Sequence, residues 1–132
     1  MLYIEDNLAN LRVMERFMRD RSEHLEVAMQ AGLGIELARE LRPAVILLDL
    51  HLPDMHGSEA LAALKADPHT APIPVIVVSA DATEGTIRRL YELGVHTYLT
   101  KPPDLAQLAA LLDELTDDAG DRADESGEPA LS

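Results

Sequence analysis

The chain has 132 residues, a formal net charge of −13 and no cysteine. This length fits one ordinary domain with a real hydrophobic core, and the absence of cysteine excludes disulfides, thiolate metal sites and cysteine nucleophiles. The negative charge argues against a nucleic-acid backbone or an anionic membrane as the direct partner. Because no apolar run reaches the length of a membrane span and no signal peptide is recognisable, we expect a cytoplasmic protein without membrane insertion.

Short apolar segments alternate with helical patterns along the chain. The predicted strands cover residues 2–4, 25–29, 45–50, 73–78 and 95–100. The predicted helices, of which the first and last begin at the capping residues Asn7 and Asp104, cover residues 8–18, 35–41, 58–66, 83–93 and 104–115. The runs VILLDL and IPVIVV are apolar without alternation, as expected for parallel strands buried on both faces. The pattern predicts an α/β domain with a doubly wound parallel sheet and helices on both faces.

The chain ends in a strongly acidic segment. Residues 117–132, DDAGDRADESGEPALS, carry six acids against one arginine and almost nothing apolar. We therefore expect one folded domain over residues 1–116 and an acidic disordered tail or linker over residues 117–132. The part of this chain after Leu115 is too short and too polar for a folded output domain.

Polar side chains stand at the ends of four of the five predicted strands. Glu5 and Asp6 follow the first strand, Asp49 lies near the end of the third, Ser79 follows the fourth and Lys101 follows the fifth. Because the carboxyl ends of parallel strands share one edge of a sheet, we expect these side chains to meet. Taken singly, the acids could be helix caps, the serine a turn residue and the lysine a solvated loop residue.

Three carboxylates at one edge repel one another unless a cation lies between them. Oxygen ligands favour a hard ion, Mg²⁺ or also Mn²⁺. A metal beside a carboxylate, facing an ammonium and a hydroxyl, suits phosphoryl transfer. Asp49 is the best candidate nucleophile because it alone ends a buried central strand, so we predict an aspartyl-phosphate. No metal site is predicted at the histidines, which lack the spacing of a ligand set: His24, His51, His56, His69 and His96.

Four separated motifs, LYIEDN, VILLDLHLPDMHG, IPVIVVSADAT and GVHTYLTKPPD, together resemble the receiver domain of two-component response regulators. The segment EDNLANLR looks most like the receivers of hybrid sensor histidine kinases. The resemblance covers residues 2–115 and implies a flavodoxin-like fold with strand order 2-1-3-4-5. It also implies a phosphoacceptor signalling domain rather than an enzyme, with self-catalysed phosphorylation and dephosphorylation. The donor would be a histidine kinase or a histidine phosphotransfer protein, and the output would act by protein contact.

The resemblance assigns roles to the acidic residues. Asp49 matches the phosphorylated aspartate. Asp6 matches a direct Mg²⁺ ligand, and Glu5 would act on the ion mainly through water. His51 would lend its backbone carbonyl to the metal.

The remaining matches concern switching and the lifetime of the phosphoryl group. Ser79 matches the hydroxyl that turns toward the phosphoryl group, and Lys101 matches the lysine that pairs with it. Tyr98 falls at the switch aromatic, which would alter the face built by the fourth helix, fifth strand and fifth helix, unless it is only a half-buried strand residue. His51 and Asp81 would flank the path of attacking water. We expect the charge of Asp81 to slow that water, unless Asp81 merely starts the next helix.

Three other classes of protein share part of this pattern. A phosphatase of the haloacid dehalogenase class also uses an aspartate nucleophile and Mg²⁺, but its DxD motif would need an acid where this chain has His51. A non-phosphorylated adaptor with the same fold is disfavoured because all the expected site residues are present. A nucleotide-binding protein is disfavoured because neither a P-loop nor a G-x-G-x-x-G turn follows the first strand.

Overall fold

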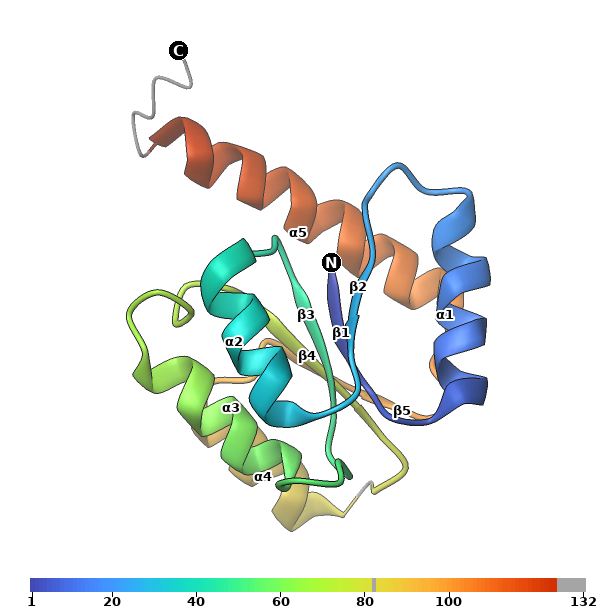
Figure 1. Cartoon of the computed structure of the whole chain (residues 1–132), viewed down its shortest axis with the longest axis vertical. Helices are drawn as coiled ribbons and strands as arrows, with labels where there is room; N and C mark the ends of the chain where they lie inside the picture. Colours follow the sequence, from blue (N-terminus) through green and yellow to red (C-terminus); the bar gives the residue numbers. More distant parts are fainter. Residues whose placement is uncertain (82, 126–132) are drawn as a thin grey trace.

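Strands and helices alternate throughout the part of the chain that this computed structural model describes, residues 1–81 and 83–125 (Figure 1). In chain order the elements are β1 (Leu2–Ile4), α1 (Leu8–Arg19), β2 (Glu26–Ala28), α2 (Ala31–Leu41), β3 (Ile46–Asp49), α3 (Gly57–Ala66), β4 (Val75–Ser79), α4 (Glu84–Glu92), β5 (Thr97–Thr100) and α5 (Leu105–Glu125). The strands are parallel and form one sheet in the order β2-β1-β3-β4-β5. The predicted doubly wound α/β fold and its strand order are confirmed.

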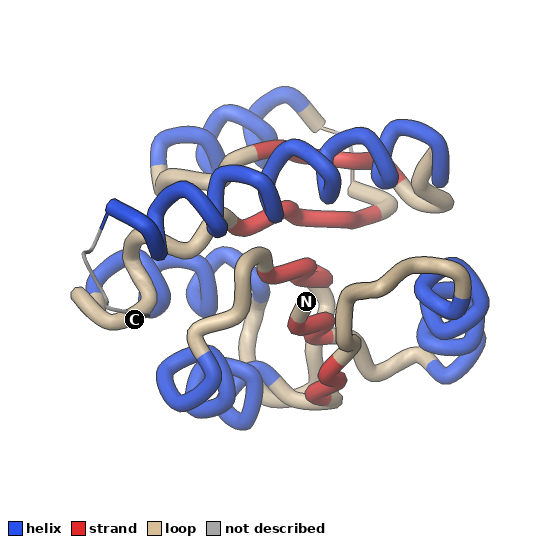
Figure 2. Tube along the Cα trace, turned by 90° about the horizontal axis from the view of Figure 1, so that it is seen from above, coloured by secondary structure: helices blue, strands red, loops and turns tan. Residues whose placement is uncertain are grey.

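Helices cover both faces of the sheet, so that the strands lie between two layers of helices (Figure 2). Alternate residues of each central strand point to opposite faces: Leu48 packs in the core with α2, α3 and α4, whereas Leu47 packs in the core with α1 and α5. All residues of β3 and β4 are buried. Burying one leucine, isoleucine or valine side chain contributes about 1.5–3 kcal/mol, so these cores hold the strand ends in place against the cost of burying polar groups there.

The start of α2 differs from its prediction. The helix begins at Ala31, earlier than residue 35, although Gln30 at its N-cap makes no side-chain cap hydrogen bond. The cap comes from Asp54 in the loop after β3, whose carboxylate accepts hydrogen bonds from Ala31 N (2.8 Å) and Gly32 N (2.8 Å). A carboxylate stabilises a helix N-terminus because the first backbone N–H groups have no partner within the helix.

The last helix also differs from its prediction. An end near Leu115 was wrong, because α5 continues to Glu125 and thus includes part of the acidic segment expected to be disordered. Once a helix has formed, each added residue gains one backbone hydrogen bond, and no proline interrupts the chain before Pro129. Residues 126–132 lie outside the described residues, and the boundary at residue 116 stays a prediction. None of the helices that the structure describes is both long enough and apolar enough to cross a membrane.

Candidate functional site

Side chains from three strand ends meet at the carboxyl edge of the sheet. Lys101, directly after β5, donates through Nζ to Glu5 Oε1 (2.7 Å) and to Asp49 Oδ1 (3.1 Å). Glu5 follows β1, and Asp49 is the last residue of β3. Within the described residues, Glu5, Asp6 and Asp49 form a group in which one carboxylate oxygen from each lies within 4.8 Å of the others. The structure thus brings together the acids and the lysine that the sequence analysis selected.

The position of Asp49 depends on close packing of α3 against β3. Gly57, the first residue of α3, donates its N–H to the carbonyl of Leu50 (2.7 Å). A Cβ at Gly57 would lie 2.6 Å from the carbonyl oxygen of Asp49, so only glycine allows this approach. Asp49 is 4 % exposed, while Leu48 and Leu50 on either side are fully buried. Its carboxylate is therefore held at the rim by an apolar strand that cannot shift without uncovering the core.

Glu5 is 1 % exposed and nevertheless well supplied with donors. Its Oε1 accepts from the Tyr3 hydroxyl (3.2 Å) and from Asn10 Nδ2 (3.1 Å), in addition to Lys101, and its Oε2 accepts from Asn7 N (3.2 Å). Burial works against the charge of this carboxylate, but the hydrogen bonds and charge of Lys101, with help from Asn7 and Asn10, outweigh it and lower the pKa of Glu5.

The pKa of Asp49 is shifted in the opposite direction to that of Glu5. Burial, together with the negative charge of Glu5, raises the pKa of Asp49, and Lys101 with the backbone of His51 only partly offsets this. For Lys101 burial also opposes the charge, but the two carboxylates raise its pKa, so the ammonium is the stable form. The site therefore holds one firmly charged carboxylate and a second that takes up a proton more readily.

The segment after β4 forms the opposite side of the site. Ser79, the last residue of β4, is fully buried, and its Oγ accepts from Asp81 N (3.1 Å). The Asp81 carboxylate accepts from Thr83 N (3.1 Å), from Thr83 Oγ1 (3.1 Å) and from Thr86 Oγ1 (3.2 Å), which lowers the pKa of Asp81. Tyr98 on β5 donates its hydroxyl to the carbonyl of Ser79 (3.2 Å) and to that of Asp81.

His51 lies in the loop after Asp49 and is exposed. It forms an isolated antiparallel bridge with His56, and the two rings meet edge to face with centroids 5.7 Å apart. His51 is also close enough to Asp81 to contribute to its lowered pKa. The predicted use of the His51 carbonyl as a metal ligand stays a prediction.

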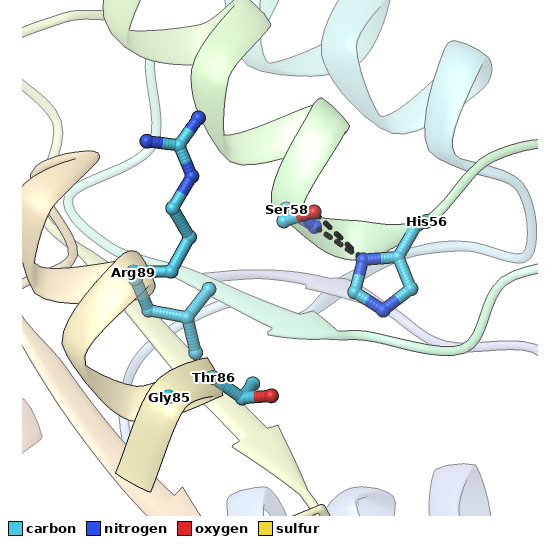
Figure 3. Close-up of a pocket in the computed structure, with 6 residues that line it drawn as sticks. His56, Ser58, Gly85, Thr86 and Arg89 are labelled. Carbon is cyan, nitrogen blue, oxygen red and sulfur yellow. Dashed lines mark hydrogen bonds between the residues drawn. The ribbon is translucent and has the colours of Figure 1, made fainter. Parts of the chain in front are cut away.

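A separate hollow of about 220 Å³ lies between α3 and α4 (Figure 3). His56 forms one wall, and its Nδ1 accepts from Ser58 N (3.1 Å) and contacts Ser58 Oγ (2.7 Å), so this histidine is the N-cap of α3. Thr86, on the other wall, is the residue that also contacts Asp81. The hollow therefore adjoins the loop after β4 rather than the carboxylate group.

The acidic group fits a hard divalent cation. Glu5, Asp6 and Asp49 offer only oxygen ligands, and three carboxylates against the single ammonium of Lys101 leave two negative charges. Asp6 is exposed, so an ion bound there keeps access to water, as Mg²⁺ prefers.

Two contributors to the site were not predicted from the sequence. Tyr3 lies in the predicted strand 2–4 and Asn10 in the predicted helix 8–18, and both donate to Glu5. The available signal was a tyrosine at the centre of a three-residue strand that is otherwise aliphatic.

Comparisons with known proteins agree with this geometry. The family model described as the response regulator receiver domain matches residues 1–113. The signal transduction histidine-protein kinase BarA of Escherichia coli strain K12 is 33% identical over 109 residues, which are 83% of this chain and 12% of BarA. The polar-differentiation response regulator DivK of Brucella anthropi is 36% identical over 102 residues, covering 76% of this chain and 82% of DivK. The chain thus spans about 12% of the length of BarA, one of the relatives it matches.

Solved structures similar to this chain include two that contain metal ions. The receiver domain of the sensor histidine kinase PA1611 from Pseudomonas aeruginosa PAO1, with magnesium coordinated in the active site cleft, has a TM-score of 0.78 at 27% identity, covering 86% of this chain and 93% of that chain. The Mn²⁺-bound form of the response regulator Rcp1 has a TM-score of 0.71 at 29% identity, covering 86% and 88%.

Proposed function

Because the chain belongs to the family of response regulator receiver domains, we propose that it is a phosphoacceptor of two-component signalling and that Asp49 is the phosphorylated residue. The observation that carries the proposal is the meeting of Asp49 with Glu5, Asp6 and Lys101 at the end of a buried central strand. Of the two buried carboxylates, Asp49 has its negative charge less well compensated by neighbouring donors, which leaves it more available for new bonds.

In the proposed reaction, a carboxylate oxygen of Asp49 attacks phosphorus and the bond between phosphorus and a histidine nitrogen of the donor breaks. The nitrogen keeps the electron pair of that bond. In dephosphorylation, the oxygen of a water molecule attacks phosphorus and the bond between phosphorus and the Asp49 oxygen breaks. The Asp49 carboxylate keeps the electron pair of that bond, and the water oxygen and its protons leave with inorganic phosphate. Both steps use the domain's own side chains, so we describe it as a self-modifying signalling domain rather than an enzyme with a turnover substrate.

We assign the metal site to Asp6 and Asp49, with the backbone carbonyl of His51 as a further ligand and with Glu5 acting on the ion mainly through water. The ion would be Mg²⁺, with Mn²⁺ as a substitute; both are named for similar solved structures. When bound, it supplies positive charge to the oxygens of the transferring phosphoryl group.

Lys101 and Ser79 would receive the phosphoryl group. Lys101 Nζ already contacts Asp49, so a short movement brings it to a phosphoryl oxygen. The Oγ of Ser79 accepts a hydrogen bond from Asp81 N, which leaves its own hydrogen free to donate to a second phosphoryl oxygen.

We propose that Tyr98 transmits this change. Its hydroxyl joins β5 to the backbone of Ser79 and Asp81, so a movement of Ser79 alters the surroundings of the tyrosine. Phosphorylation would then shift the populations of two existing arrangements of the α4-β5-α5 face rather than create a new one.

The donor in this proposal is a histidine kinase or a histidine phosphotransfer protein, and the output is contact of the switched face with another protein. The proposed donor and this domain have to meet in one compartment, which we propose is the cytoplasm. We propose no direct contact with nucleic acid and no insertion into a membrane. The net charge of −13 supports this choice of protein partners over phosphate backbones.

The test is the intact mass of the chain after incubation with acetyl phosphate, with Mg²⁺ and with EDTA. We expect one added phosphoryl group that requires both Mg²⁺ and Asp49, so that Asp49→Asn gives no adduct. Asp113→Asn removes an exposed carboxylate on α5 and serves as the matched control, with an adduct equal to that of the native chain. An adduct that survives Asp49→Asn contradicts the assignment. No adduct in a folded native chain would favour a non-phosphorylated adaptor.

A further inference from the structure

The two oxygens of the Glu5 carboxylate have unequal numbers of partners. Oε1 accepts from the Tyr3 hydroxyl at 3.2 Å, from Asn10 Nδ2 at 3.1 Å and from Lys101 Nζ at 2.7 Å. Oε2 accepts only from Asn7 N at 3.2 Å among the described residues. A carboxylate offers about four lone-pair positions, so Oε1 is saturated and Oε2 can take a further partner.

Tyr3 is an unusual choice for its position. It is 3 % exposed, at the centre of β1, and packs in the core with α1 and α5. A buried phenol needs a hydrogen-bond partner, which an aliphatic residue at this position would not. Among the described residues its hydroxyl donates to Glu5. The hydroxyl therefore contributes to the site rather than to the core.

A small cavity lies beside the donors of Glu5. A cavity of about 70 Å³ is lined by Tyr3, Asn10 and Lys101, together with Val13, Met14, Pro102 and Pro103. These three donors of Glu5 thus have open space beside them, so their hydrogen bonds to the Glu5 carboxylate contribute to holding its orientation.

Lys101 is shared between Glu5 and the proposed reaction. Its Nζ also contacts Asp49, and in the proposed function it turns to a phosphoryl oxygen. Tyr3 and Asn10 donate to Oε1 independently of Lys101, because they come from other elements of the fold, β1 and α1.

We propose that the Tyr3 hydroxyl is a positioning group for the metal site, which fixes Oε1 of Glu5 and so presents Oε2 to the divalent cation and its bound water. This inference rests on the metal site of the proposed function. Tyr3 does not touch the ion or the phosphoryl group and acts only through Glu5.

The test measures Mn²⁺ affinity from the loss of the electron paramagnetic resonance signal of free Mn²⁺. Tyr3→Phe keeps the ring in the core and removes only the hydroxyl, and we expect Mn²⁺ binding to weaken by about tenfold, the size typical for loss of a group that orients a metal ligand. Tyr91→Phe removes a phenol hydroxyl from the half-exposed surface of α4 and is the matched control, with native affinity. Thermal unfolding without metal checks that both variants fold.

A second pair of chains separates positioning from general loosening of the fold. In a Glu5→Gln background the carboxylate is gone, so adding Tyr3→Phe is expected to cause no further loss of Mn²⁺ affinity. Unchanged binding in Tyr3→Phe, or an equal loss in the Glu5→Gln background, overturns the inference. Either result leaves phosphorylation of Asp49 standing. A native chain that binds no Mn²⁺ overturns this inference together with the metal site of the proposed function.

Discussion

The two sides of the candidate site are constructed differently. On the side of β1 and α1, Glu5 is buried and receives donors from Tyr3, Asn7, Asn10 and the distant Lys101. Two of these partners are side chains fixed in regular structure, Tyr3 in the buried strand β1 and Asn10 in α1. Displacing Tyr3, Asn7 or Asn10 would leave the buried Glu5 carboxylate with fewer donors, which is costly.

On the side of β4 and α4, the hydrogen bonds are local or end on backbone carbonyls. Among the residues that the structure describes, the Asp81 carboxylate bonds only to Thr83 and Thr86 of its own segment, and Tyr98 donates to the carbonyls of Ser79 and Asp81. Such bonds can be exchanged for bonds to water or to a neighbouring carbonyl at little cost. The difference supports our proposal that the side of β1 and α1 holds an ion in place and the side of β4 and α4 changes its arrangement.

The largest effect is expected from removing the cation that joins Glu5 to Asp49. Lys101→Met leaves two buried carboxylates without an ammonium, so the free energy of unfolding in EDTA should fall by about 2–4 kcal/mol. Mg²⁺ should restore more stability to this variant than it adds to the native chain, because the ion replaces the missing charge. Urea unfolding with and without Mg²⁺ measures both.

Lys65→Met is the matched control for that experiment. Lys65 is partly buried but donates only to the carbonyls of Ala71 (3.0 Å) and Ile73 (2.9 Å), so it has no carboxylate partner. Its loss should lower stability by about 1–3 kcal/mol without any added response to Mg²⁺. An equal response to Mg²⁺ in both variants would show that Lys101 is not the charge partner of the acids.

Removing the charge of either buried carboxylate should have a smaller effect on stability, and the sign of that effect should differ between Asp49 and Glu5. The pKa of Asp49 is raised in the fold, so its charged form destabilises the metal-free chain at neutral pH, a cost that disappears as the pH falls through that raised pKa. The pKa of Glu5 is lowered, so its charged form stabilises the chain above its ordinary pKa, a gain that is lost as the pH falls through the lowered pKa.

Asp49→Asn should therefore stabilise the metal-free chain at pH 7 and Glu5→Gln should destabilise it, each by about 1 kcal/mol. Urea unfolding in EDTA at pH 7 and again near pH 4 measures the difference, which should shrink at the lower pH. Changes of the same sign in both variants would mean that the two carboxylates share one environment, contrary to the comparison.

The meeting of the strand-end residues was predictable because it follows from topology. Once the strands are parallel, Glu5, Asp49, Ser79 and Lys101 have to share one edge of the sheet, whatever their detailed contacts. The fold itself was predictable from apolar runs and caps. Asn7, for example, accepts from Asn10 N as an N-cap should.

The contacts that depend on distant partners were not predictable. Asp54, in the loop after β3, caps the N-terminus of α2, and the sequence around Gln30 gives no indication of this distant cap. A tyrosine within a strand pattern is most simply a core residue, so the contact of Tyr3 with Glu5 appears only when the direction of each side chain is known. The end of α5 was missed because acidic composition was given more weight than the absence of a helix-breaking residue.

The smallest effect concerns Asp81, whose carboxylate has two candidate roles. If its charge slows the water that attacks the phosphoryl group, Asp81→Ala and Asp81→Asn should both speed decay of the phosphoform, by about two- to threefold, the size expected for a screened charge. If it only starts α4 through Thr83 and Thr86, Asp81→Asn should behave as the native chain, because the amide oxygen still accepts from Thr83 N. We expect the first result, because Asp81 lies on the same short segment as Ser79, the hydroxyl proposed to face the phosphoryl group, and its backbone N–H donates to Ser79 Oγ. The decay of the phosphorylated mass with time after removal of the donor measures it, and native decay in Asp81→Asn would show that this side of the site does not govern phosphoryl lifetime through charge.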